Sequence, residues 1–266
     1  MKDWLGIKGK IYLVTGGSSG IGKAIVEALL QEETTVINLD IQDSEIKDKN
    51  YLFIQTDVTN RQAVETAVEV VVDKFGTIDG VVNNAGINIP ALLVDPKDSH
   101  GKYELSDDSF DKMTSINQKG LFLVAQTVGR ILVAKKSGVI INMASEAGLE
   151  GSEGQGAYSG TKAAVIGYTR SWAKELGKYN VRVVGIAPGI MEETGLRTLA
   201  YEEALSYTRG KTVEELRKGY ANTSATPLGR SGKLSEVADL VCYYLSDRSS
   251  YITGITTNIA GGKSRG

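Results

Sequence analysis

Short apolar segments alternate along the chain with longer segments of helical periodicity. The segments at 11–14 and 139–143 lack polar alternation and contain β-branched residues, which is typical of strands buried on both faces of a parallel sheet. Residues 61–75 instead carry apolar side chains at helical spacing. Strands are therefore predicted over 11–14, 34–39, 51–55, 81–82, 139–143, 181–187 and 252–259, and helices over 21–30, 61–75, 121–134, 158–176 and 237–245.

This alternation indicates the architecture. Strands followed by helices form βαβ units, and right-handed crossovers then place the strands in one parallel sheet with helices on both faces. No repeat, low-complexity block or linker divides the sequence. We therefore predict a single doubly wound α/β domain over residues 1–266. It includes a helical insertion at about 190–225, with a capping box at Thr212 and Glu215, which forms a lid over the substrate.

Composition narrows the possible functions. The 266 residues are 41% hydrophobic and 23% charged, with a net charge of −2, which is typical of a globular protein and lacks the basic charge of a general nucleic-acid binder. No apolar run reaches the ~18 residues of a membrane span, and no secretion signal is recognisable. The single Cys242 excludes an intrachain disulfide, and the single His100 excludes a multi-histidine zinc site. We expect a cytoplasmic protein without a metal, nucleic-acid or membrane partner.

A glycine-rich turn lies between the first predicted strand and the first predicted helix. Glycines at 16, 20 and 22 allow the backbone to turn tightly and to approach a pyrophosphate, which the positive end of the helix dipole then binds. A glycine-rich turn can also be a turn and nothing more, so the interpretation depends on the flanking strand and helix. The candidate cofactor contacts here are Gly16, Ser18, Ser19, Gly20, Ile21 and Gly22.

An acidic residue ends the second predicted strand. Asp40 lies 20 residues beyond Gly20, where a carboxylate accepts hydrogen bonds from the ribose hydroxyls of NAD and repels the 2′-phosphate of NADP. The alternative for Asp40 is a solvated strand end. Asp57 follows the third predicted strand and is placed to reach the adenine amino group. This pattern favours NAD as the cofactor.

A candidate catalytic pair lies on a later helix. Tyr158 and Lys162 are four residues apart, so their side chains share one helix face. An ammonium beside a phenol lowers a pKa that begins near 10, which lets a tyrosine exchange a proton with an alcohol or a carbonyl. Ser145 follows the fifth predicted strand, and its hydroxyl can orient the substrate oxygen. A Tyr-x-x-x-Lys pair alone is a weak motif in a chain with 12 tyrosines, so the ordered combination carries the argument.

With the glycine turn, Ser145 and the Tyr158–Lys162 pair in this order, the sequence resembles the short-chain dehydrogenase/reductase family across nearly its whole length. The resemblance implies a Rossmann fold, a nicotinamide cofactor and a homotetramer with the late helix and the final strand at its interfaces. The matching segments are residues 15–22, Asp57, Val58, residues 83–86, Asn117, Ser145, residues 158–162, Pro188 and Gly189.

The resemblance also implies roles for individual residues. Tyr158 is then the general acid and base, Lys162 holds the nicotinamide ribose and tunes Tyr158, and Ser145 binds the reacting oxygen. Asn117 binds a water that connects Lys162 to solvent. The further cofactor contacts implied are Asp57, Val58, Asn84, Ala85, Gly86, Tyr158, Lys162, Pro188 and Gly189.

The sequence departs from the family pattern in two places. Glu193 stands where the family often has a threonine that contacts the nicotinamide carboxamide, so this contact shifts to Thr194 or is lost. The link from Gly86 to Phe110 is longer than usual and contains His100. One interpretation of this link is a plain surface loop. The alternative is a functional element, which is either a wall of the substrate mouth or a subunit contact.

Two segments are expected to contact the substrate. The segment at 146–155 is polar and glycine-rich, which suits a polyol better than a steroid or a fatty chain, and it offers Glu146, Ser152 and Gln155. The segment at 191–220 adds Arg197, Arg209 and Lys211 as candidate ligands of a phosphate. Because this segment also contains many acidic residues, a solvated helical surface is the alternative.

The segments at 84–90, 145–152 and 193–215 resemble members of the family that oxidise sorbitol 6-phosphate to fructose 6-phosphate with NAD. The alternatives are a 3-oxoacyl-carrier-protein reductase or another polyol dehydrogenase of the same family and, outside the enzymes, a catalytically silent dinucleotide sensor. The intact set of Ser145, Tyr158 and Lys162 argues against the sensor. Asp40 argues against the NADPH that the carrier-protein reductase usually needs.

Overall fold

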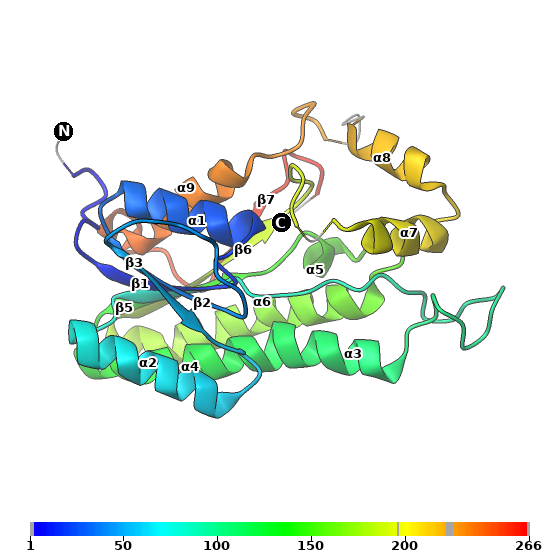
Figure 1. Cartoon of the computed structure of the whole chain (residues 1–266). Helices are drawn as coiled ribbons and strands as arrows, with labels where there is room; N and C mark the ends of the chain where they lie inside the picture. The colour runs from blue at the N-terminus through cyan, green and yellow to red at the C-terminus, as the bar shows by residue number, and fades with distance from the viewer. Residues whose placement is uncertain (1–2, 196, 222–225, 265–266) are drawn as a thin grey trace.

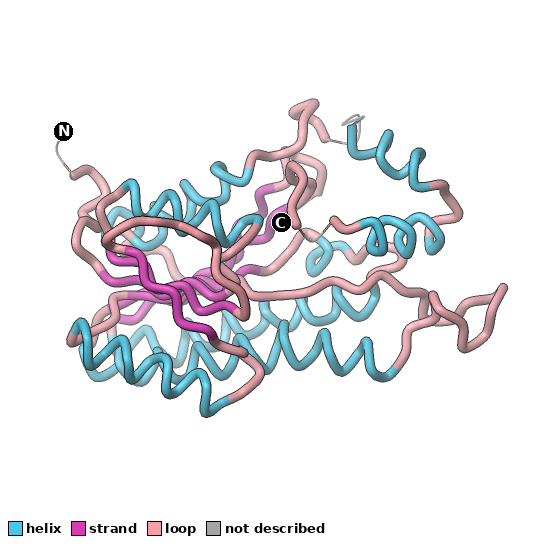
Figure 2. Tube along the Cα trace, in the orientation of Figure 1, coloured by secondary structure: helices cyan, strands magenta, loops and turns pink. Residues whose placement is uncertain are grey.

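The computed structural model describes residues 3–195, 197–221 and 226–264. A parallel seven-stranded sheet forms the centre, with the strand order β3-β2-β1-β4-β5-β6-β7 (Figures 1 and 2). The α/β fold predicted from the sequence is confirmed. The strands are β1 (Ile11–Thr15), β2 (Thr35–Asp40), β3 (Tyr51–Gln55), β4 (Gly80–Asn83), β5 (Gly138–Met143), β6 (Val181–Pro188) and β7 (Thr256–Ile259).

Helices cover both faces of the sheet (Figure 1). One face packs against α1 (Gly20–Gln31) and α9 (Leu234–Leu245), and the other against α2 (Arg61–Phe75), α4 (Leu121–Lys135) and α6 (Gly156–Leu176). Alternate residues of β1 supply the two cores: Tyr12 and Val14 pack with α1 and α9, while Leu13 packs with α2 and α4. This two-sided burial explains why the strands lack polar alternation.

Besides the short helix at Ala147–Glu150, the last strand and the segment before residue 121 differ from the predicted elements. The last strand begins at Thr256 rather than at residue 252, because Gly254 has a left-handed φ of +74° and turns the chain. A further helix, α3 (Asp107–Thr114), continues through a π-helix at Ser115–Gly120 into α4. The α3 segment is mostly polar and buries only Met113, so apolar periodicity did not predict it.

The segments beyond the carboxyl ends of the strands gather on one side of the sheet, where further helices lie (Figure 1). The predicted capping box is confirmed: the Thr212 N–H donates to Glu215 Oε2 (2.8 Å) and the Glu215 N–H donates to Thr212 Oγ1 (3.1 Å). The helices here are α5 (Ala147–Glu150), α7 (Leu199–Thr208) and α8 (Val213–Ala221), and short 3₁₀ turns lie elsewhere at Gly177–Tyr179 and Asp247–Ser249.

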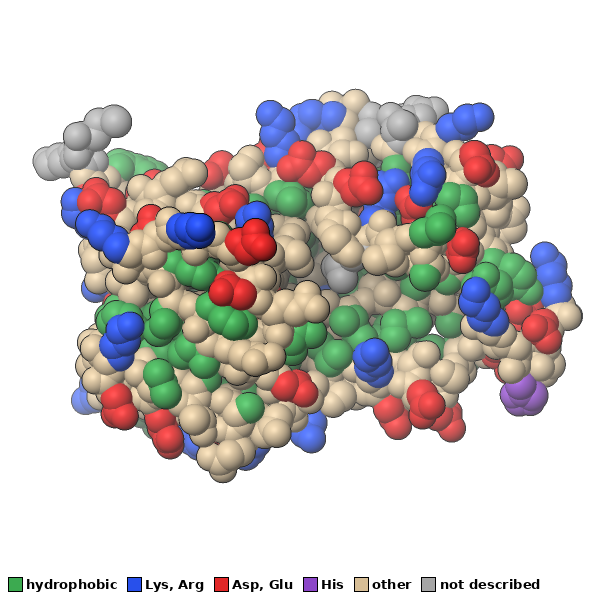
Figure 3. Space-filling model, in the orientation of Figure 1, with side chains coloured by type: hydrophobic (Ala, Val, Ile, Leu, Met, Phe, Trp, Pro, Cys, Tyr) green, Lys and Arg blue, Asp and Glu red, His purple; other side chains and the backbone are tan. Residues whose placement is uncertain are grey.

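Positive and negative side chains are interspersed over the face drawn in Figure 3. Within the described ranges, no helix is both long and apolar enough to cross a membrane.

Candidate active site

A cavity of about 570 Å³ opens at the carboxyl edge of the sheet. Strands β1 to β6 end at its wall, and the segments that follow them line it. This is where ligands bind in open parallel sheets, because the strand ends and the helix N-termini converge there. One half of the cavity is formed by the glycine turn, and we call it the cofactor half. The other half is formed by α5, α7 and α8, and we call it the substrate half.

The glycine turn leaves no room for a side chain at several of its glycines, as Gly16 and Gly22 show. A Cβ on Gly16, whose φ is +65°, would lie 2.9 Å from the Ala85 Cα, and one on Gly22 would lie 2.0 Å from the Gly16 carbonyl oxygen. Ser19, the N-cap of α1, makes no side-chain capping bond, and Ser19, Gly20 and Ile21 line the cavity, so the first turn of this helix faces it. Free N–H groups at a helix N-terminus bind phosphate oxygens.

Hydrogen bonds from the second strand hold the turn in shape. The Gly17 N–H donates to Asn38 Oδ1 (2.9 Å) and the Ser18 N–H donates to Asp40 Oδ2 (3.0 Å). Asp40 lines the cavity, as predicted from the sequence, whereas the Ser18 side chain bonds the Gln42 carbonyl and does not line it. Asn38 was not predicted, since nothing in its local pattern distinguishes a buried amide in a strand.

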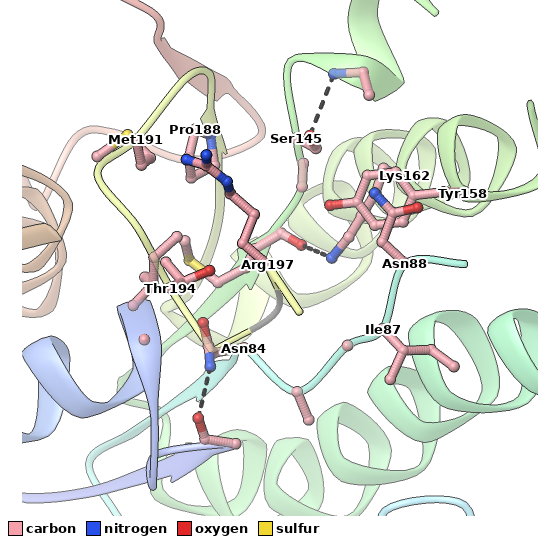
Figure 4. Close-up of a pocket in the computed structure, with 18 of the residues that line it drawn as sticks. Asn84, Ile87, Asn88, Ser145, Tyr158, Lys162, Pro188, Met191, Thr194 and Arg197 are labelled. Atoms are coloured by element: carbon pink, nitrogen blue, oxygen red, sulfur yellow. Dashed lines mark hydrogen bonds between the residues drawn. The ribbon is translucent and has the colours of Figure 1, made fainter. Parts of the chain in front are cut away.

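Asn84 ties the fourth strand to the glycine turn. Its Nδ2 donates to the carbonyl oxygens of Thr15 (3.1 Å) and Gly16 (2.9 Å), a contact drawn in Figure 4. The Thr15 hydroxyl in turn accepts from the N–H groups of Asn84 and Ala85 (3.0 Å each). The predicted cofactor contacts that line the cavity are Gly16, Ser19, Gly20, Ile21, Asp40, Asp57, Val58, Asn84, Ala85, Gly86, Tyr158, Lys162, Pro188, Gly189 and Thr194.

Ser145, Tyr158 and Lys162 come together on one wall of the cavity (Figure 4). Ser145 follows β5, and its Oγ accepts from the Ala147 N–H (3.2 Å). Lys162 is 5% exposed, and its Nζ donates to the Met143 carbonyl (2.7 Å) and lies 5.8 Å from the centre of the Tyr158 ring. The predicted helix face therefore brings the phenol and the ammonium into one small volume.

Burial changes the acidity of both groups. It raises the pKa of Tyr158, and the hydrogen bond with Ser145 opposes this only in part. It lowers the pKa of Lys162 to about 8. The lowered pKa of Tyr158 that the sequence suggested is therefore wrong for this state, because desolvation dominates and the Lys162 ammonium binds the Met143 carbonyl.

Asn117 lies beside the cavity rather than on its wall. Its Oδ1 accepts from the Ile87 N–H (2.9 Å), and its Nδ2 donates to the Ile87 carbonyl (2.9 Å) and to Thr161 Oγ1 (3.1 Å). A Cβ on Gly86 would be 3.3 Å from this Oδ1 and 3.5 Å from the Lys162 Nζ, so the amide and the ammonium approach the same point. The structure thus shows Asn117 joining α6 to the segment after β4.

Thr194, rather than Glu193, lies on the cavity wall. Thr194 lines the cavity and packs against Gly20, whose added Cβ would lie 3.3 Å from the Thr194 Cβ. Glu193 is exposed and does not line the cavity. The expected shift of this contact to Thr194 is therefore geometrically possible.

The substrate half contains five of the six residues predicted for it. Glu146, Ser152, Gln155, Arg197 and Arg209 line the cavity. Lys211 does not line it and is exposed beyond the end of α7.

Other lining residues of this half were not predicted. Lys263, near the C-terminus, forms an ion pair with the buried Glu146 (2.9 Å). Tyr201 accepts a hydrogen bond from Gln155 (2.8 Å). Burial and then the neighbouring Tyr220 raise the pKa of Tyr201, so its hydroxyl stays protonated. Neutral hydroxyl and amide groups of this kind suit a ligand with several hydroxyl groups.

The long link after Gly86 has two parts. Ile87 and Asn88 line the cavity (Figure 4), whereas His100 lies at an exposed tip with a φ of +60° and pairs with Glu104 (3.4 Å). Within the described residues, no group of three or more His, Cys, Asp or Glu side chains is placed to hold a metal ion.

Comparisons with known proteins agree with this geometry. Residues 10–204 match the sequence profile of the family described as short chain dehydrogenase. The chain is 56% identical to sorbitol-6-phosphate 2-dehydrogenase from Klebsiella pneumoniae, with all of both chains covered. It is 39% identical to a 3-oxoacyl-[acyl-carrier-protein] reductase from Thermotoga maritima, covering 96% of this chain and 98% of the relative.

A solved structure supports the same assignment. The ligand-free aldohexose dehydrogenase of Thermoplasma acidophilum superposes with a TM-score of 0.84 and 28% identity, covering 98% of this chain and 97% of the other. The glycine turn, the strand ends and the pair Tyr158 and Lys162 on α6 therefore occur in a chain that matches dehydrogenases in both sequence and fold. The chain belongs to the short-chain dehydrogenase/reductase family and is an oxidoreductase that uses a nicotinamide cofactor.

Proposed function

We propose that this protein oxidises sorbitol 6-phosphate to fructose 6-phosphate with NAD. The observation that carries the proposal is the 56% identity over the full length of the Klebsiella enzyme, against 39% for the carrier-protein reductase. The polar substrate half, with Glu146, Gln155 and Arg209 on its wall, supports a phosphorylated polyol. Initial rates over a panel of free and phosphorylated sugar alcohols, with NAD and with NADP, test it directly.

The residues of the cofactor half fit a dinucleotide. The glycines at 16 and 22 let the backbone of the turn pack closely, and the N-terminus of α1, which has no side-chain cap, faces the cavity where a pyrophosphate would lie. Asp40 would then bind the adenosine ribose, and Lys162 the nicotinamide ribose. A nicotinamide held there would supply the acceptor for the hydride that leaves C2 of the substrate.

Residues of the chain itself transfer the proton of the substrate hydroxyl. The Tyr158 phenolate removes the proton of the C2 hydroxyl during oxidation, and the phenol returns one during reduction. The Ser145 hydroxyl orients the same oxygen by a hydrogen bond. The positive charge of Lys162 favours the phenolate as it forms, and Asn117 supports a proton path from Lys162 to solvent.

The other candidates make different predictions. A carrier-protein reductase needs room for a fatty chain, whereas this cavity is walled by an ion pair of Glu146 with Lys263 and by a tyrosine hydroxyl. A silent dinucleotide sensor shows no turnover with any alcohol. One turnover assay separates the sensor from the enzymes, and the substrate panel separates the enzymes from one another.

The expected preference for NAD depends on Asp40. Replacing Asp40 with Ala removes an acceptor for ribose hydroxyls and a charge that repels a 2′-phosphate, so kcat/KM with NAD should fall by roughly 10–100-fold and the preference should narrow or reverse. Asp43→Ala is the matched control, because Asp43 lies outside the cavity wall. Equal kcat/KM for NAD and NADP in the wild type would refute this assignment.

The pH dependence of the two directions should differ. Since burial raises the pKa of Tyr158, the phenol is protonated at neutral pH and only a small fraction acts as base. We expect kcat/KM for oxidation to rise about tenfold per pH unit from the acid side, whereas reduction, which uses the phenol, should not rise. The rise should weaken above about pH 8, where Lys162 loses its proton. A flat profile for oxidation would contradict the assignment of Tyr158 as base.

Three further expectations belong to this proposal. The homotetramer implied by the family resemblance is measurable by light scattering. The cytoplasmic location is measurable by fractionation. The single domain over residues 1–266, with its lid at about 190–225, predicts one cooperative unfolding transition.

A further inference from the structure

The cations on the substrate side of the cavity differ in how they are paired. Arg197 forms an ion pair with the buried Glu202 (3.2 Å), and Lys263 pairs with Glu146 (2.9 Å). Arg209 instead donates only to neutral oxygens, those of the Ser152 hydroxyl (3.0 Å) and the Glu153 carbonyl (3.3 Å). Among the described residues, no carboxylate oxygen lies within 4.0 Å of its guanidinium. The charge of Arg209 is therefore not neutralised by a direct ion pair.

The guanidinium also retains hydrogen-bonding capacity. Of its five N–H donors, one on Nε and one on Nη2 are used, so others remain for a ligand. A planar guanidinium matches two oxygens of a phosphate, and such charge-assisted pairs are stronger than neutral hydrogen bonds. Because the Ser152 hydroxyl accepts from Arg209, its own hydrogen is available to a third phosphate oxygen. Both residues line the cavity.

The loop that carries Ser152 is fixed against α7. A Cβ on Gly154, whose φ is +75°, would lie 2.0 Å from the Thr208 Oγ1, so the loop and the end of α7 are in close contact. Gln155 bonds Tyr201 at the other end of the same helix (2.8 Å). These contacts set the separation between Ser152 and Arg209.

The long link after Gly86 braces this arrangement. Tyr103 stacks on Tyr207 of α7, with ring centres 4.2 Å apart, and the Tyr207 hydroxyl donates to Asp95 Oδ2 (2.8 Å). Asp95 is only 2% exposed. The Ala91 N–H donates to the Gly154 carbonyl (2.9 Å), so the link holds both the loop and the helix. We call the contacts among Asp95, Tyr103 and Tyr207 the clasp.

We propose that Arg209 and Ser152 form the subsite for the phosphate group of the substrate, and that the clasp positions it. This inference rests on the proposed function, since it assigns the phosphate end of that substrate. It gives the link at 87–110 a role in substrate binding without placing its clasp residues in contact with the substrate. Arg209 and Ser152 are binding residues, and Tyr207 is a positioning residue.

The first test compares Arg209→Ala with Lys211→Ala. Both changes remove one positive charge within three residues, but Lys211 lies off the cavity wall. Arg209→Ala should lower kcat/KM for sorbitol 6-phosphate by about 10²-fold more than it lowers kcat/KM for sorbitol, whereas Lys211→Ala should leave both unchanged. Inorganic phosphate should inhibit the wild type competitively against sorbitol 6-phosphate and should inhibit Arg209→Ala far more weakly.

The second test addresses the clasp. Tyr207→Phe keeps the stacked ring but removes the bond to Asp95, so we expect KM for sorbitol 6-phosphate to rise while kcat and KM for NAD change little. Tyr251→Phe is the control, because Tyr251 is exposed and lies outside both the clasp and the cavity wall. A general loss of structure would instead lower kcat and weaken NAD binding as well.

The outcomes separate the subsite from the proposed function. A wild type that prefers sorbitol 6-phosphate, with an Arg209→Ala variant that keeps this preference, overturns the subsite and leaves the function standing. A wild type without the preference removes both. Should Arg209→Ala not fold, Arg209→Lys and Ser152→Ala carry the test, and unchanged preference in both would overturn the subsite.

Discussion

Replacing Tyr158 with Phe should abolish nearly all turnover while NAD still binds. The substitution removes one hydroxyl from a half-buried ring on the cavity wall and leaves the ring itself in place, so the loss falls on proton transfer, which is worth about 10²–10⁴-fold in rate. The measurements are kcat in both directions and a fluorescence titration with NAD.

Tyr168 provides the control for this change. It lies on the same helix, α6, but its hydroxyl donates to Gln118 and it does not line the cavity, so Tyr168→Phe should keep its turnover. Lys162→Ala should damage both turnover and NAD binding, since the ammonium serves both. A Tyr158→Phe enzyme with normal kcat would remove Tyr158 from the mechanism.

The wild type should discriminate strongly between sorbitol 6-phosphate and sorbitol. A phosphate far from the reacting carbon adds binding energy that helps to position C2, so its loss should lower kcat/KM and also kcat. Each hydrogen bond to a charged group contributes ~1.5–3 kcal/mol, and two such bonds correspond to roughly 10²–10⁴-fold at 1.4 kcal/mol per decade. Steady-state rates on both compounds measure this ratio. Comparable kcat/KM values would leave a general polyol dehydrogenase.

Features encoded in short segments were predictable from the sequence. Strands such as β1 bury both faces, and this leaves a continuous apolar run. The cofactor half consists largely of strand ends, and parallel pairing brings these ends to one edge of the sheet. The sequence alone therefore suffices to place Gly16 and Asp40 close together. Tyr158 and Lys162 share a helix face by their spacing alone.

Features that depend on distant contacts were not predictable in this way. Lys263 reaches Glu146 across 117 residues, by way of left-handed turns at Gly261 and Gly262. No local pattern distinguishes Lys263 from Lys211, which does not line the cavity. The acidity of Tyr158 likewise depends on burial and on the partner chosen by Lys162, and both are properties of the assembled fold.

The π-helix at Ser115–Gly120 restricts how the length of this chain can vary. Its hydrogen bonds span one residue more than those of the α-helices on either side, so α3 and α4 meet in a register that a continuous α-helix would not give. Deleting one residue from this stretch would allow regular α-helical bonding but would turn α3 by about 100° relative to α4. Asn117 would then lose Ile87 and Thr161. A single-codon deletion here should therefore be far less tolerated than the same deletion at the exposed tip around His100.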